Sequence, residues 1–518
     1  MASETASTND PFRDPSADPS LEDIHHTPSV AESTLAVGRN ASLTLGTKEL
    51  IVLDEGFVDQ GNGLCCGLIP ERNKTTKTIP FFNILWAELS NFDIIIHYAK
   101  PIAKDKVRVA YITYNVEKTE RSKVTEWTAK LLNRAYGKSQ RQKRVKVLVN
   151  PFGGKGQAQK TFIRDVEPIL AAARCLIDVE RTKFQGHAVE IAENLDYNAF
   201  DVIASASGDG LPHEVFNGLG RKPDAIKALQ KVAVVQLPCG SGNAMCGNLN
   251  GTSSPTMAAL CLVKGLRTPL DLVSITQGGR RTLSFLSQSV GIIAESDLAT
   301  EHLRWMGAAR FTYGFLIRLI RKQLYPCDLA VKVEVEDKAT IRKHYHRELT
   351  SHSDENARRG DFINTETVGL PPLKYGTETD ELPGDWEVVS YDTMGNFYAG
   401  NMAYMSTGAN FFPASLPDDG CMDLVNIDGD VSRTAALQCM FAVDKLHGEF
   451  FDLPQVKYRK VTAYRITPKR QRDGYISIDG EKIPFEPFQA EVHRGLGTVL
   501  SRTGRVYEAP GVTYNYVG

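Results

Sequence analysis

The sequence predicts an α/β domain with a parallel sheet, followed by a largely antiparallel β domain and preceded by a smaller β domain. Strands alternate with helices from residue 144 to about 270, and long strands with few helices follow. Strict alternation indicates a parallel sheet wrapped by helices. At 518 residues, of which 42% are hydrophobic and 24% charged, the chain is long enough for about three domains.

The first 137 residues divide into a tail and a β domain. Residues 1–38 contain seven acids, one arginine and many Ser and Thr, so we expect a disordered tail. In 39–137, alternating apolar runs predict strands, and one helix should follow them. The strands are expected at 49–53, 92–97 and 107–114, and the buried face of the helix at Val124, Trp127, Leu131 and Leu132.

The α/β domain is expected at 143–275 and the β-rich domain at 276–518. Short apolar runs predict parallel strands at 145–149, 176–182, 202–205 and 232–236, with helices at 157–173, 187–195 and 212–219 between them. A charged stretch with little periodicity, about 337–385, reads as an inserted, partly disordered loop in the β-rich domain.

Composition excludes several classes of function. The net charge of −2 disfavours a globally basic nucleic-acid binder, and neither a spanning apolar segment nor a secretory signal is expected. The nine cysteines show no zinc spacing and read as thiols of a reducing compartment. Cys65 and Cys66 are either ordinary thiols or an acylation site. The basic run Arg134–Lys146 is either a solvated linker or a patch for anionic lipid headgroups.

Three glycine-rich turns follow three of the expected parallel strands. They are Asn150-Pro-Phe-Gly-Gly-Lys-Gly156, Ser207-Gly-Asp-Gly210 and Pro238-Cys-Gly-Ser-Gly-Asn243. In an open α/β sheet, ligands bind at the carboxyl ends of the strands. Glycines let backbone N–H groups approach an anion there, so polyphosphate is the natural ligand. The turns match neither the P-loop nor the dinucleotide pattern, and no protein-kinase motif set is present.

These turns, with further motifs in the same order, resemble the diacylglycerol-kinase catalytic superfamily, and within it the sphingosine (long-chain base) kinases. The further motifs are Gly291-Ile-Ile-Ala-Glu-Ser-Asp297, Met306–Gly314, Leu416-Pro-Asp-Asp-Gly-Cys-Met-Asp-Leu424 and Ile478-Asp-Gly-Glu481. The N-terminal β domain resembles a pleckstrin-homology-like module, as in fungal and plant members.

The resemblance implies an ATP-dependent kinase with a nucleotide-binding α/β domain and a lipid-binding β domain. Asp209 would act as general base on a lipid primary hydroxyl. A carboxylate between two glycines at a sheet edge suits that role, although Gly-Asp-Gly is also a common turn. The nucleotide contacts carried over are Asn150, Phe152, Gly153, Gly154, Lys155, Thr182, Ser207, Gly208, Gly210, Gly240, Ser241, Asn243, Arg304, Arg310, Asp479, Gly480 and Glu481. Some members have arginine where this chain has Phe152, which cannot pair with phosphate.

Asp479 and Glu481 would also assist Mg²⁺, although Asp-Gly is equally a β-turn between two strands. Asp297 would hold the ammonium head of the lipid, which disfavours a neutral diacylglycerol, and Ser287 would contact the same head group. The resemblance assigns Leu286, Ile292, Ile293, Phe311 and Phe315 to the alkyl-chain tunnel, whereas by composition alone each is equally ordinary core.

The expected product is the 1-phosphate of sphingosine, dihydrosphingosine or phytosphingosine. Ceramide kinase, diacylglycerol kinase and a catalytically dead lipid-binding scaffold are the alternatives. We expect a cytoplasmic protein bound peripherally to intracellular or plasma membranes through the β domain and the Arg134–Lys146 run. The oligomeric state is open, with a homodimer as one alternative.

Overall fold

The chain folds into two compact units in a computed structural model. The first contains residues up to 143 together with 163–176 and 259–264, and the second contains the rest. The structure describes residues 33–38, 40–55, 76–240, 242–298, 324–350, 368–406, 408–443, 448–469 and 474–513, without the side chains of 154, 155 and 297. Residues 1–32 of the predicted tail, and Cys65 and Cys66, lie outside these ranges. The tail was predicted to extend to residue 38, but 34–37 form a strand that pairs with 41–44, so the β domain begins earlier than the sequence indicated. No described helix is long and apolar enough to cross a membrane.

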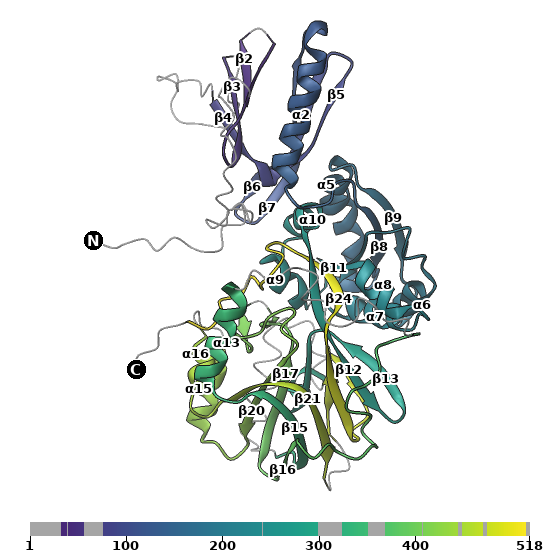
Figure 1. Ribbon diagram of the computed structural model, residues 1–518, viewed down its shortest axis with the longest axis vertical. Coiled ribbons are helices and arrows are strands. Elements are labelled where there is room, and N and C mark those ends of the chain that lie inside the picture. The colour runs from purple at the N-terminus through teal and green to yellow at the C-terminus, as the bar shows by residue number, and fades with distance from the viewer. Residues whose placement is uncertain are drawn as a thin grey trace, which may run out of the picture. The chain divides into compact units, whose positions relative to one another are not determined.

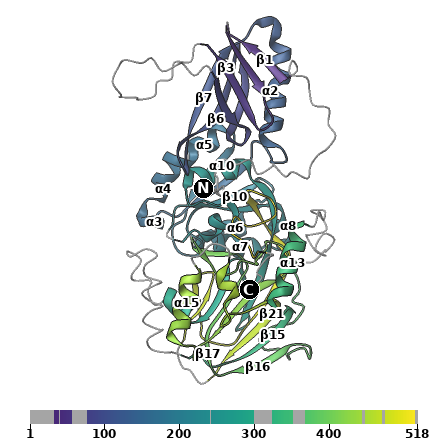
Figure 2. The same ribbon diagram turned by 90° about the vertical axis from the view of Figure 1, so that its left-hand side faces the viewer.

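The N-terminal part of the first unit consists of two antiparallel sheets and one long helix (Figures 1 and 2). The four-stranded sheet contains β1 (Thr34–Val37), β2 (Ala41–Leu45), β3 (Glu49–Asp54) and β4 (Thr76–Pro80). The three-stranded sheet contains β5 (Ile84–Ser90), β6 (Asp93–Ala103) and β7 (Lys106–Asn115), and α2 (Arg121–Tyr136) follows. The helix face predicted from the apolar spacing, Val124, Trp127, Leu131 and Leu132, is buried.

The second unit begins with parallel strands, as the alternating pattern predicts. In the sheet, β10 (Val202–Ser207) pairs in parallel with β8 (Arg144–Val149) and with β11 (Ala233–Pro238), and β9 (Leu176–Arg181) lies beyond β8. The main connecting helices are α6 (His187–Asn194), α7 (Gly210–Gly220), α8 (Ala225–Lys231), α9 (Ala244–Asn250) and α10 (Pro255–Lys264).

The last long strand, β24 (Phe488–Ser501), joins the parallel strands to the antiparallel ones. It pairs in parallel with β11 through Val234 and Val499, and antiparallel with β12 (Leu266–Gln277) and β21 (Lys457–Pro468). One sheet therefore continues from β9 to the antiparallel strands, which also include β13 (Arg280–Ser284), β14 (Ser287–Gly291), β15 (Cys327–Val335), β16 (Glu387–Tyr391), β17 (Met394–Gly400), β20 (Met422–Asp428), β22 (Ile476–Ile478) and β23 (Glu481–Ile483).

Three predicted features differ in detail. The boundary predicted at 275 lies within the last residues of β12, a strand that pairs antiparallel with β24 and β13. The helix expected at 157–173 is interrupted by a π-helical turn at Phe162–Val166. The charged insertion is not irregular throughout, because it begins with α13 (Lys338–Thr350), and Ile341 and Tyr345 of that helix are buried.

The end of the basic run, Lys143 to Lys146, is buried or half-buried, whereas Arg134 and Lys138 are exposed. Lys143 is buried and donates to the carbonyl of Val263 at 2.7 Å. Arg144 pairs with Asp201 at 2.8 Å. Lys146 pairs with Asp178 at 3.1 Å and with Glu180 at 2.8 Å. The acids that pair with Arg144 and Lys146 lie 32 to 57 residues away in sequence, so these two pairs could not be read from the run itself.

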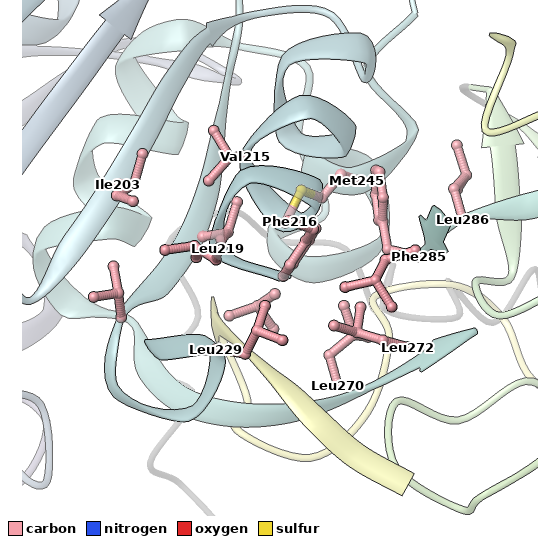
Figure 3. Packing of buried hydrophobic residues seen from close by; sticks show 14 of the residues in the cluster. Ile203, Val215, Phe216, Leu219, Leu229, Met245, Leu270, Leu272, Phe285 and Leu286 are labelled. Carbon is pink, nitrogen blue, oxygen red and sulfur yellow. The ribbon is translucent and has the colours of Figure 1, made fainter. Parts of the chain in front are cut away.

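A hydrophobic core connects the parallel strands and their helices to the first antiparallel strands (Figure 3). Phe216 of α7 packs against Phe285, with ring centroids 5.5 Å apart. Leu270 and Leu272 of β12 and Met245 of α9 belong to the same cluster. The core thereby places the start of α7 close to the β13–β14 turn.

Candidate active site

The second and third glycine-rich turns touch each other at the carboxyl ends of β10 and β11. A Cβ on Gly240 would lie 2.2 Å from the backbone nitrogen of Gly208 and 2.4 Å from its Cα. The amide of Asp209 donates to the carbonyl of Gly242 at 3.2 Å. Only residues without a side chain allow this approach, so the glycines at 208 and 240 bring the two turns together.

Asp209 directly precedes α7 and its carboxylate is held by three donors. Oδ1 accepts from the amide of Met245 at 3.0 Å and from Nε2 of Gln236 at 3.1 Å. Oδ2 accepts from the amide of Ala244 at 2.9 Å. A carboxylate offers about four acceptor positions, so the described residues leave one position on Oδ2 unused.

The environment makes Asp209 more basic than an ordinary aspartate. Burial raises the pKa of its carboxyl, and the negative charge of Asp479 adds to that effect. The donors Met245, Ala244 and Gln236 oppose it without cancelling it. A fixed carboxylate with a raised pKa and a free acceptor position is suited to take a proton from a hydroxyl group.

The first glycine-rich turn follows β8, and it has a fixed hydrogen bond at its start and an exposed phenylalanine beside it. Oδ1 of Asn150 accepts from the amide of Phe152 at 3.0 Å, and Gly153 opens the short helix α3 (Gly153–Gly156). The amide of Thr182 donates to the carbonyl of Val149 at 3.0 Å, which places Thr182 beside this turn. The side chain of Phe152 is 78% exposed. The side chain of Lys155 and the whole of Ser241 lie outside the described residues.

Asp479 occupies a β-turn between β22 and β23, and its carboxylate is saturated. Asp479 and Gly480 have φ values of +52° and +88°, which agrees with the interpretation of Asp-Gly as a β-turn between two strands. Oδ1 accepts from the Ser284 hydroxyl at 2.6 Å, the Leu286 amide at 3.0 Å and the Ser287 amide at 2.9 Å. Oδ2 accepts from the amide of Phe285 at 3.0 Å and lies 2.8 Å from Nδ1 of His213.

Of the two carboxylates predicted to assist Mg²⁺, that of Asp479 accepts from five donors, which occupy its acceptor positions. The carboxylate instead anchors the β13–β14 turn. Its pKa is lowered, because the hydrogen bonds and the charge of His213 outweigh burial. Glu481 is more open: Oε2 accepts from Nε2 of Gln185 at 3.2 Å, and Oε1 lies 3.7 Å from where a Cβ of Gly210 would stand. Within the described ranges, no three His, Cys, Asp or Glu side chains are arranged to hold a metal.

A cavity of about 240 Å³ opens beside Glu481. Its polar lining includes Gln185, His213, Glu214, Arg221, Arg281 and Glu481, which come from α7, β13, β23 and the segment before α6. Sequence reasoning missed Gln185, His213 and Arg281. His213 follows Asp209 by four residues, which is about one helical turn, and this spacing was the available signal.

The predicted lipid contacts are only partly visible. Leu286 and Ser287 are buried, and their backbone amides donate to the carboxylate of Asp479. Asp479 therefore links both residues to the region of the candidate base. Ile292 and Ile293 begin α11 (Ile292–Leu298) and pack on two different core clusters. The side chain of Asp297, and Arg304, Arg310, Phe311 and Phe315 entirely, lie outside the described residues.

Comparison with known proteins identifies the family. Sphingoid long chain base kinase 5 of Saccharomyces cerevisiae is 36% identical over 500 residues, covering 86% of this chain and 71% of that protein. The chain belongs to the sphingoid long-chain base kinase family. Sphingoid long chain base kinase 4 of Schizosaccharomyces pombe is 32% identical, covering 85% of this chain and 91% of that protein. Human sphingosine kinase 1 is 31% identical, covering 68% of this chain and 88% of that protein.

The domain matches agree with the long-chain base kinase assignment. Residues 144–275 match the diacylglycerol kinase catalytic domain, which holds all three glycine-rich turns. Residues 374–501 match the YegS C-terminal NAD kinase beta sandwich-like domain, and 33–137 match a domain of unknown function, DUF7493. The resemblance of that N-terminal part to a pleckstrin-homology-like module stays a prediction.

Proposed function

We propose that the protein transfers the γ-phosphate of ATP to the primary hydroxyl of a sphingoid long-chain base. The observation that carries this is Asp209, a half-buried carboxylate with one acceptor position left open by the described residues, in a chain of the sphingoid long-chain base kinase family. In this proposal Asp209 takes the hydroxyl proton as the oxygen attacks. The rest of phosphoryl transfer depends mainly on positioning and charge neutralisation.

The nucleotide would lie over the three glycine-rich turns. Their backbone amides can approach phosphates because no side chains cover them. The cavity beside Glu481 is lined by Gln185, which is three residues after Thr182 in the chain. We therefore assign this cavity to another part of the same nucleotide. Glu481 is the carboxylate that would hold Mg²⁺, which when bound neutralises phosphate charge and usually takes only one or two protein carboxylates.

The head group of the substrate is assigned to Asp297. A sphingoid base carries an ammonium, and a carboxylate would pair with it. Asp297→Asn is therefore expected to lower kcat/KM for sphingoid bases about 10- to 150-fold, with a smaller effect on ATP. Ceramide lacks the charge and carries an acyl group at that nitrogen, so wild-type protein should use it poorly.

The decisive experiment compares four lipids under one detergent condition. Purified protein is given labelled ATP with sphingosine, phytosphingosine, ceramide or diacylglycerol. We expect phosphorylation of the two bases, lost with Asp209→Asn and weakened with Asp297→Asn. Preference for ceramide or diacylglycerol would overturn the substrate assignment, and no product from any lipid would favour the scaffold alternative.

We further propose a cytoplasmic protein that associates peripherally with membranes, since long-chain bases partition into bilayers. A homodimer is compatible with this activity. Sedimentation equilibrium of the purified protein tests the homodimer, and fractionation of cells at low and high salt tests the membrane association.

A further inference from the structure

Several exposed cations lie at the turn that joins β6 to β7. The hairpin tip, defined as residues 100–108, contains Lys100, Lys104, Lys106 and Arg108, all exposed, and a single acid, Asp105. Among the described residues, none of these four cations forms an ion pair within 4.0 Å. The charge of Lys106 helps to lower the pKa of Asp165. The tip is therefore a cationic surface, in contrast to the end of the basic run, Lys143 to Lys146.

Two of these cations stand directly opposite each other. Lys100 and Arg108 are register partners across the antiparallel pair β6–β7. Like charges directly opposite each other on neighbouring strands destabilise a sheet. A bound anion would remove the repulsion, so this pairing indicates an anionic partner.

The tip also exposes apolar surface between the cations. Ile102 is 49% exposed between Lys100 and Lys104, and Pro101 beside it is exposed as well. Further along β7, Tyr111 is 67% exposed. A nucleic acid or an acidic peptide would pair with the cations but would not bury the side chain of Ile102. An anionic bilayer would interact with both. Its headgroups would pair with the cations, its hydrocarbon layer would accept the aliphatic side chain, and tyrosine is favoured at the interface between them.

We propose that the hairpin tip is the surface by which this protein docks on an anionic lipid bilayer, with Ile102 inserted and Lys100 and Arg108 at the headgroups. The proposed lipid kinase function explains why docking would be useful, since it would bring the protein to a substrate in the bilayer. In this respect alone the inference rests on that function. The charges and exposure that support it lie entirely within the first unit.

The test is co-sedimentation with vesicles of phosphatidylcholine, with and without phosphatidylserine. The variants are Lys100→Gln/Arg108→Gln and Ile102→Ser. The matched control is Lys118→Gln/Lys123→Gln, which removes two exposed cations of the same domain beyond the other end of β7. Each cation near such a surface contributes about fivefold to affinity, so the double tip variant should bind about 25-fold more weakly. The control should stay within about twofold of the wild type.

Three further readouts separate the alternatives. The double tip variant should unfold at a slightly higher temperature than the wild type, since it relieves the cross-strand repulsion, so loss of binding cannot be attributed to unfolding. Ile102→Ser should weaken binding while leaving its salt dependence intact. Kinase activity on detergent-dispersed base should be unchanged in all three variants.

The proposal is overturned if the tip variants bind vesicles like the wild type, or if the control loses as much binding as they do. Binding of the tip to soluble heparin with no binding to vesicles would also overturn it, in favour of a polyanionic macromolecule. A protein that binds vesicles through the tip but phosphorylates no lipid in detergent would instead defeat the proposed function and leave the docking surface standing.

Discussion

His213 Nδ1 lies 2.8 Å from Asp479 Oδ2, a contact that spans 266 residues of sequence. His213 stands one turn after Asp209 on α7, whereas Asp479 forms the turn between β22 and β23. Both side chains are almost fully removed from solvent, with exposed fractions of 12% and 0%. The pair therefore ties the helix that carries the candidate base to the hairpin that carries Glu481.

This pair should make stability depend on pH in a defined direction. The pKa of His213 is raised, since the hydrogen bond and charge of Asp479 outweigh burial, and the pKa of Asp479 is lowered. The stabilisation from His213 is then complete below its unfolded pKa of about 6.5 and is lost as pH rises through the folded pKa. The contribution of Asp479 is complete above about 3.9 and is lost as pH falls through its folded pKa.

We expect His213→Gln to lower the free energy of unfolding by about 1.5–3 kcal/mol near pH 6, with a smaller difference near pH 9. Urea unfolding at both pH values measures it. Asp479→Asn and the double variant complete a cycle that isolates the pair. A His213→Gln effect that is equal at the two pH values would show that the imidazole is not charged in the folded protein.

Asp209→Asn should lower kcat about 100- to 10,000-fold, because an amide cannot accept the hydroxyl proton. The amide oxygen can still accept from Met245 and Gln236, so the fold and ATP binding should largely persist. Single-turnover kinetics and nucleotide titration measure the two separately. More than a tenth of the wild-type rate would be incompatible with the base assignment.

Gly240→Ala should disrupt the contact between the second and third turns. The new methyl group would stand 2.2 Å from the Gly208 nitrogen, and rigid backbone cannot yield as a side chain can. We expect loss of nucleotide binding and a lower melting temperature. Gly247→Ala is the matched control, since its methyl group meets nothing within 4 Å and alanine favours the helix by about 1 kcal/mol. Similar melting temperatures for both variants would contradict this account.

Lys460 should be essential to the β-rich domain. Its ammonium is fully buried between Asp419 at 2.7 Å and Asp423 at 3.2 Å, and both acids are buried too. Lys460→Met would leave uncompensated buried charge, so we expect a loss of about 3–5 kcal/mol in the free energy of unfolding. Lys457→Met tests the exposed pair with Asp428, which is expected to contribute less than about 1 kcal/mol. Equal losses in chemical denaturation would refute the distinction.

Local pattern was sufficient for the elements and for the turns that carry the chemistry. The spacing of Val124, Trp127, Leu131 and Leu132 predicted a buried helix face that the structure confirms. Alternating strands and helices placed the three glycine-rich turns at one edge of a sheet, because the carboxyl ends of parallel strands share that edge. Asp209 was assigned as the base through the family resemblance, and its position between two glycines at a sheet edge agreed with that role.

Only the tertiary structure decided which charged groups are available. Asp479 reads as a metal ligand in sequence, yet five donors from β13, β14 and α7 saturate it. Lys143, Arg144 and Lys146 read as an open patch, yet distant carbonyls and acids satisfy them, while Lys100 and Arg108 meet across a hairpin. The sequence by itself determined the order of elements and the positions of the turns, because both depend on neighbours a few residues apart. Pairing, burial and the pKa values they shift depend on partners tens to hundreds of residues away, so they required the folded chain.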